Sequence, residues 1–120
     1  MINDPVILND WYVVGRSSDL AEGCILAARL FDENLVLWRK DGELMCWKDV
    51  CRHRGTKLSL GEIKDGELAC PYHGWRYGKD GVCTHIPAQP NTQPPAQARA
   101  VVYQVTEAYD FIWASLGEPT

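Results

Sequence analysis

The sequence contains the same turn signal three times. Lys-Asp-Gly occurs at residues 40–42, 64–66 and 79–81, each time between stretches that contain apolar residues. Asp-Gly between such stretches is among the strongest short-range signals for a β-hairpin. The sequence therefore predicts three β-hairpins, each made of two antiparallel strands.

Further segments rich in β-branched and aromatic residues recur at intervals of about ten residues, separated by turn signals. No stretch shows a sustained 3.6-residue periodicity between good caps, and residues 17–22 form at most one helical turn. The predicted fold class is all-β, an antiparallel sandwich or small barrel. Four prolines in residues 86–98 favour a surface crossing or a mobile loop there. The predicted strands are 11–14, 24–29, 35–38, 44–47, 62–63, 68–69, 75–78, 82–85, 100–105 and 111–114.

Length and composition predict a single soluble domain over residues 1–120. The net charge of −4 argues against nucleic-acid binding, because phosphate contacts need a face rich in Lys and Arg. The apolar runs are too short for a membrane span, and the first residues lack the basic cluster of a targeting signal. Five cysteines at irregular spacing fit a reduced compartment better than a secreted disulfide frame. We therefore expect a cytoplasmic protein.

Two short segments each combine one cysteine with one histidine: Cys51 with His53, and Cys70 with His73. Each segment follows a predicted strand and is closed by a glycine. Two thiolates and two imidazoles suit either a tetrahedral zinc ion or an iron pair, with sulfur on one iron and nitrogen on the other. Zinc sites more often take a cysteine pair from one loop and a histidine pair from the other. The mixed loops favour a binuclear cluster, with zinc as the alternative.

With their neighbours, these segments resemble a known family. Cys-Arg-His-Arg-Gly at 51–55 and Cys-Pro-Tyr-His-Gly-Trp at 70–75 resemble the two cluster-binding boxes of Rieske [2Fe–2S] proteins. The resemblance extends over essentially the whole chain, because the flanking hairpins fit the Rieske β-fold. It implies a Rieske-type [2Fe–2S] cluster as cofactor. It also implies a small cluster-binding subdomain of two loops, within residues 48–85.

Carried over residue by residue, the resemblance implies four metal ligands. Cys51 and Cys70 would hold the buried iron, and His53 and His73 the outer iron. Cys83 lies close to the second box in the sequence but is not needed as a ligand. No catalytic residue is predicted.

The residues around the boxes resemble a low-potential subfamily. High-potential Rieske proteins carry an additional disulfide whose cysteine positions correspond here to Thr56 and Tyr72. Trp75 replaces their serine donor to the cluster, whereas Tyr77 keeps the tyrosine position. Fewer hydrogen-bond donors to the cluster imply a reduction potential in the lower part of the Rieske range of about −150 to +300 mV. The amino-acid sequences of the second box and of the start of the chain are most similar to the N-terminal domain of Rieske non-haem iron oxygenases, a group that includes dioxygenases.

Such oxygenases also need a mononuclear iron held by two histidines and a carboxylate. The sequence has three histidines, and only His85 remains once the cluster ligands are assigned. The resemblance therefore implies an oxidoreductase component that transfers one electron, with its catalytic domain or subunit supplied elsewhere. A reductase or ferredoxin is the expected redox partner, and the full-length protein could form a homo-oligomer. The alternative is a stand-alone Rieske-type ferredoxin that serves a separate oxygenase or reductase.

Two other sets of residues have simpler interpretations. Arg52, Arg54 and Arg76 form either a solvated rim or a docking patch for an acidic redox partner. Cys24 and Cys46 lie on predicted strands and are expected to be small buried hydrophobic residues.

Overall fold

The computed structural model describes residues 10–51, 56–71, 74–87, 93–94 and 98–117. Within them, the chain forms one six-stranded and one four-stranded sheet, and every strand pairing is antiparallel. This confirms the predicted all-β fold class. Two short 3₁₀ turns lie between strands, η1 (Ser17–Asp19) and η2 (Leu58–Leu60). In the part of the chain that the structure describes, no helix is long and apolar enough to cross a membrane.

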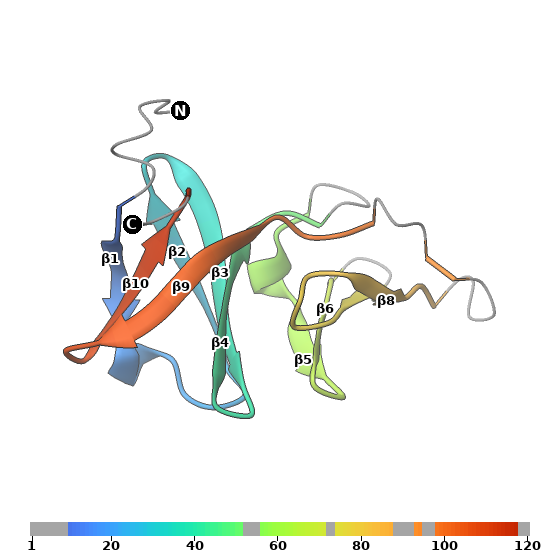
Figure 1. The fold of residues 1–120 in the computed structure, drawn as a ribbon. Coiled ribbons are helices and arrows are strands. Elements are labelled where there is room, and N and C mark those ends of the chain that lie inside the picture. Colours follow the sequence, from blue (N-terminus) through green and yellow to red (C-terminus); the bar gives the residue numbers. More distant parts are fainter. Residues whose placement is uncertain (1–9, 52–55, 72–73, 88–92, 95–97, 118–120) are drawn as a thin grey trace.

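The larger sheet curls into a nearly closed barrel, which Figure 1 shows beside the smaller sheet. Its strand order is β1-β10-β9-β4-β3-β2, and the two edge strands β1 and β2 also pack against each other. Curling of this kind protects the sheet edges from pairing with other chains. The strands are β1 (Tyr12–Arg16), β2 (Ile25–Leu30), β3 (Glu33–Lys40), β4 (Glu43–Lys48), β9 (Val102–Ala108) and β10 (Phe111–Ser115).

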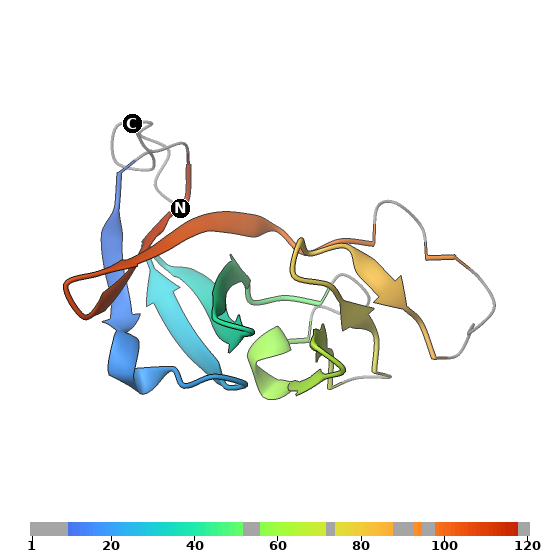
Figure 2. The same ribbon diagram turned by 60° about the horizontal axis from the view of Figure 1, so that its bottom comes forward.

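The smaller sheet lies to one side of the barrel (Figure 2). It has the strand order β5-β6-β7-β8, with β5 (Glu62–Lys64), β6 (Glu67–Ala69), β7 (Arg76–Tyr77) and β8 (Cys83–His85). The returning chain runs along it: the Cys83 amide donates to the Ala98 carbonyl at 2.9 Å, and the Ala100 amide donates to the Gly81 carbonyl at 2.7 Å. The described residues of 86–98 form no helix or strand, as the prolines predict.

Four hairpins turn through two residues, both with positive φ. Asp41-Gly42 and Asp65-Gly66 make two of these turns, and the third predicted hairpin joins β7 to β8. The other two tight turns, Phe31-Asp32 and Tyr109-Asp110, contain no glycine. The sequence did not predict these hairpins, because a bulky residue pays a steric cost at positive φ that the flanking strand pairing must outweigh.

Strands β3 and β4 form a wall between two hydrophobic cores. Leu35 and Leu37 of β3 point into the barrel core together with Ile112. Val36 and Trp38 point to the opposite side, into the core beneath the small sheet. Because side chains alternate along a strand, a strand with both faces buried appears in sequence as an uninterrupted apolar run. This explains why residues 35–38 are all fully buried.

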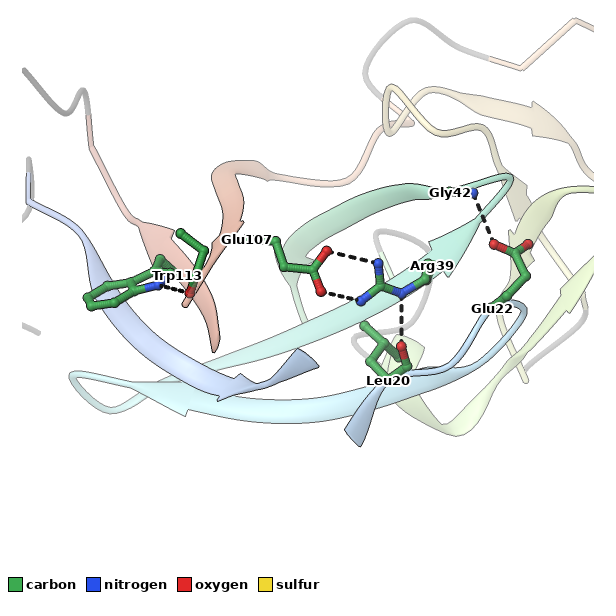
Figure 3. A network of polar contacts seen from close by, with 7 residues as sticks. Leu20, Glu22, Arg39, Gly42, Glu107 and Trp113 are labelled. Atoms are coloured by element: carbon green, nitrogen blue, oxygen red, sulfur yellow. Dashed lines mark hydrogen bonds and ion pairs between the residues drawn. The ribbon is translucent and has the colours of Figure 1, made fainter. Parts of the chain in front are cut away.

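A polar network joins the turn end of the β3–β4 hairpin to its neighbours (Figure 3). The Arg39 guanidinium donates to both carboxylate oxygens of Glu107 on β9, at 3.0 and 2.8 Å, and its Nε donates to the Leu20 carbonyl at 2.8 Å. Arg39 thereby lowers the pKa of Glu107 to about 2. Glu22 accepts the amides of Asp41 and Gly42 at 2.7 and 3.0 Å, and these bonds lower its pKa.

Candidate metal centre

The two predicted cysteine ligands occupy equivalent positions in two loops. Cys51 follows β4, and its amide donates to the carbonyl of Thr56 at 2.7 Å. Cys70 follows β6, and its amide donates to the carbonyl of Trp75, also at 2.7 Å. Each loop is therefore closed by the same bond, from the cysteine to the carbonyl five residues later. The sequence predicted two loops, and the structure shows that each is closed by a hydrogen bond of the same kind.

Both cysteine side chains are buried in the core beneath the small sheet, with exposed fractions of 1% for Cys51 and 3% for Cys70. All five cysteines lie in the described residues, and none forms a disulfide. Two buried thiols in one core are a suitable sulfur set for a metal, because a thiolate in an apolar core needs a cation to balance its charge. The residues present therefore fit the sulfur half of the predicted ligand set. His53 and His73 lie outside the described residues.

Tyr77 lies directly against one predicted ligand. Its hydroxyl oxygen is 3.3 Å from Cys51 Sγ, and its ring is fully buried. The ring packs edge-on against Trp47, with centroids 6.2 Å apart, and Trp47 packs edge-on against Trp38 at 5.3 Å. When the sulfur is a metal-bound thiolate, the tyrosine hydroxyl is the donor. The aromatic stack thus fixes the direction of a hydrogen bond to the cluster sulfur.

A buried carboxylate, not predicted from the sequence, fastens the first loop. Asp49, two residues before Cys51, accepts the Ser59 amide at 2.7 Å and the Ser59 hydroxyl at 2.6 Å. The Asp49 amide donates to the Asn34 carbonyl at 2.9 Å, which ties this end to β3. The Asp49–Ser59 pair therefore closes the base of the first loop. The sequence signal that could have predicted this contact is an aspartate and a serine at the two ends of the loop that holds Cys51.

The remaining cysteines occupy three different environments. Cys83 is buried in the same core as the two predicted ligands, and burial raises the pKa of its thiol. Cys46 is buried on the barrel side of β4, and burial raises its pKa to about 12. Cys24 is exposed and precedes β2, so the expectation that it is a buried hydrophobic residue was wrong. The strand begins one residue later than predicted, which leaves the Cys24 side chain outside the sheet.

The three arginines expected to form a solvated rim or a docking patch are only partly described. Arg52 and Arg54 lie outside the described residues. Arg76 donates to Asp65 at 3.0 Å, and 23% of its side chain is exposed. Arg76 is therefore an ion-paired residue of the small sheet and is better described as part of a rim.

A pocket of about 410 Å³ opens beside the second loop. Its lining includes Cys70, Pro71 and Gly74 of the loop, Ala69 just before it, and Leu60 at the end of η2. No sequence signal predicted this pocket, because it forms where residues 60–64 meet the second loop and Pro87, which come later in the chain.

The family model for the Rieske [2Fe-2S] domain matches residues 10–105. The chain therefore belongs to the Rieske [2Fe–2S] domain family, and its cofactor is a Rieske-type [2Fe–2S] cluster. This confirms the resemblance based on the two cluster-binding boxes, and it favours the binuclear iron cluster over the zinc alternative.

The similar proteins include oxygenases and an oxidoreductase. The chain is 38% identical over 114 residues to the oxidoreductase NdmD of Pseudomonas putida, covering 93% of this chain and 19% of NdmD. It is 41% identical over 91 residues to the methylxanthine N1-demethylase NdmA of the same organism, covering 76% of this chain and 26% of NdmA.

Solved structures agree with this placement. Apo dicamba monooxygenase superposes with a TM-score of 0.86 at 34% identity, covering 94% of this chain and 35% of the other. NdmA superposes with a TM-score of 0.85 at 35% identity, covering 90% of this chain and 34% of the other. The chain thus spans about a fifth to a third of the length of these relatives.

Proposed function

We propose that this domain accepts one electron from a redox partner and delivers it to the mononuclear iron of a Rieske oxygenase. The observation that carries the proposal is the pair of equivalent loops that bury Cys51 and Cys70 in one core. The similarity to oxygenases, together with the family match, supports the oxygenase setting.

The proposed ligands are Cys51 and Cys70 on one iron and His53 and His73 on the other. The bound cluster supplies a one-electron couple. The described residues give this couple its surroundings: the two cysteine side chains are shielded in an apolar core, and Tyr77 directs its hydroxyl at the Cys51 sulfur. We also propose a midpoint potential in the lower part of the Rieske range, because Trp75 stands where high-potential members carry a serine donor and Thr56 and Tyr72 stand where they carry a disulfide.

The proposed partners follow from the histidine count. With two of three histidines assigned to the cluster, these 120 residues cannot supply a facial triad, so a catalytic domain or subunit provides the mononuclear iron. A reductase or ferredoxin supplies the electron. We propose a cytoplasmic location, because five cysteines that form no disulfide suit a reducing compartment. We also propose a homo-oligomer for the full-length protein.

A second candidate is favoured by the similarity to the oxidoreductase NdmD, which covers 93% of this chain. In that setting the domain carries electrons within or for an oxidoreductase component that is not itself the oxygenase. The chemistry at the cluster is the same, and only the protein that receives the electron differs.

The ligand assignment is tested by single substitutions with matched controls. His53→Ala and His73→Ala should abolish the Rieske electron paramagnetic resonance signal of the reduced protein, whereas His85→Ala should retain it. Cys51→Ser and Cys70→Ser should likewise lose the cluster, while Cys24→Ser keeps it. Loss of the signal in the His85 or Cys24 variant alone would contradict the assignment.

The direction of electron transfer is tested by mixing the reduced protein with an oxidised oxygenase catalytic component in a stopped-flow instrument. Reoxidation coupled to product formation supports the oxygenase setting. Reoxidation only by a second electron carrier, with no product, supports the oxidoreductase setting.

A further inference from the structure

Leu60 is held outward at the end of a firmly anchored turn. Its exposed fraction is 69%, whereas Leu58 at the start of the same turn is fully buried in the core. Between them, Ser59 donates its amide and its hydroxyl to the buried Asp49. Because the turn is fixed from both sides, Leu60 is presented to solvent on a rigid backbone. A fixed apolar contact of this kind loses little freedom when a partner binds.

The pocket beside Leu60 leads to the second cluster-binding loop. Its lining runs from Leu60 to Cys70, a proposed ligand, and to Pro71 next to it. A side chain of a partner that enters this pocket would touch the loop that holds the cluster. This position offers a short path for an electron between two proteins.

The charge of this region differs from that of the rest of the chain. Residues 50–78 of the sequence carry five basic and three acidic side chains, a net charge of +2, whereas the remaining residues carry seven and thirteen, a net charge of −6. Two of the five basic residues, Arg52 and Arg54, lie outside the described residues, and the carboxylate Glu62 lines the pocket together with Lys64 and the ion-paired Arg76. Lys57 and Lys64, which flank Leu60 in the sequence, are both exposed, and Lys64 lines the pocket. Within the described residues, neither lysine has an acidic partner at ion-pair distance.

We propose that Leu60, Lys57, Lys64 and the adjoining pocket, here called the Leu60 face, form the docking site for an acidic protein that donates the electron. The inference rests on the proposed electron-transfer function. Docking involves no bond formation: the donor loses one electron and this domain gains it. Electron-transfer complexes have small interfaces and are steered by complementary charge. This suits one apolar contact flanked by two exposed lysines that have no acidic partner among the described residues. A permanently attached domain would need a larger and more apolar interface.

The test measures the rate at which a pre-reduced, acidic plant-type ferredoxin reduces the cluster-loaded protein, at low and at high salt. The variants are Leu60→Ser and Lys64→Glu. Their matched controls are Tyr109→Ser, which removes a side chain that is 87% exposed at the β9–β10 turn, and Arg16→Glu, an equal charge reversal on β1. Midpoint potential and the rate of reduction by dithionite are measured on every variant.

At low salt we expect both face variants to be reduced by ferredoxin about tenfold more slowly than the wild type, with unchanged potential and unchanged dithionite reduction. High salt should remove most of the difference for Lys64→Glu but not for Leu60→Ser, because salt screens charge and leaves apolar contact intact. The two control variants should react like the wild type.

Equal ferredoxin rates for the wild type and both face variants would overturn the proposal. So would normal reduction by ferredoxin combined with slowed transfer to a catalytic component, since the Leu60 face would then serve the electron acceptor. A wild-type protein that dithionite cannot reduce, and that shows no Rieske signal, would instead overturn the proposed function itself.

Discussion

The hydroxyl oxygen of Tyr77 lies 3.3 Å from the sulfur of Cys51, and the two residues are fixed by different parts of the fold. Cys51 lies in the loop that follows the barrel strand β4, whereas Tyr77 belongs to the small sheet. A change in how the two sheets pack would therefore alter a hydrogen bond to a cluster ligand.

Tyr77→Phe should lower the midpoint potential of the cluster. A hydrogen bond to the sulfur stabilises the reduced, more negative state, so its loss favours the oxidised state. A differential of about 1 kcal/mol corresponds to a decrease of about 40 mV for a one-electron couple. Potentiometric titration measures the shift, and Tyr103→Phe, on β9 beside the barrel core, is the matched control. An unchanged midpoint in Tyr77→Phe would contradict the prediction.

Ser59→Ala should destabilise the first loop through loss of the bonds to Asp49. The buried carboxylate would lose its hydroxyl partner at 2.6 Å, which costs about 1–3 kcal/mol of unfolding free energy. Urea unfolding followed by fluorescence gives the free energy, and cluster content after gel filtration reports on the loop. A double-mutant cycle with Asp49→Asn should give a coupling energy well above zero. Strictly additive effects would show that the pair does not act together.

Gly61→Ala should disturb the packing of η2 against the second loop. A Cβ at Gly61 would collide with the carbonyl oxygen of Ala69, the residue before Cys70, so the backbone must shift. We expect a loss of about 1–3 kcal/mol in stability together with weaker cluster retention. Gly15→Ala is the control, because a Cβ there meets only the flexible end of Leu26 at 3.3 Å. Equal losses in the two variants would count against this explanation.

Glu107→Gln should reduce stability at neutral pH but much less in acid. The pKa of Glu107 is about 2 in the folded state, below its ordinary value of 4.5, because its carboxylate accepts two hydrogen bonds from the Arg39 guanidinium. Its stabilisation is therefore complete above about pH 4.5 and is lost as the pH falls toward 2. The pair is partly exposed, so we expect a difference of about 1 kcal/mol between variant and wild type at pH 7. Urea unfolding at pH 7 and pH 3 measures this difference in stability. A difference that is as large at pH 3 as at pH 7 would contradict the prediction.

Thiol labelling should separate the cysteines by burial. Cys24 is exposed and should react with iodoacetamide in the native protein, whereas Cys46 should not, because burial raises its pKa to about 12. Mass spectrometry of the digested protein locates the label. Native labelling at Cys46 at a rate similar to Cys24 would show that the barrel core opens readily.

The sequence predicted much of this fold because its signals are local. Asp-Gly at 41–42 and at 65–66 adopts positive φ at both positions, and the apolar run 35–38 is one continuous buried strand. The Phe31-Asp32 turn escaped prediction because its conformation is imposed by the register of β2 with β3 rather than by its own residues. The Cys51 and Cys70 positions were predictable from the two boxes. The Asp49–Ser59 pair and the pocket beside Leu60 were not, because both depend on which segments meet in space.

The wall formed by β3 and β4 has a consequence for how the protein folds. Its two faces belong to different cores, so neither the barrel nor the cluster-binding half is a separate cooperative unit. Removal of the iron should loosen the side of the wall that carries Trp38 and Trp47, and Leu35 and Leu37, which face the other core, should lose stability with it. We therefore expect cluster assembly and folding of the barrel to be coupled equilibria.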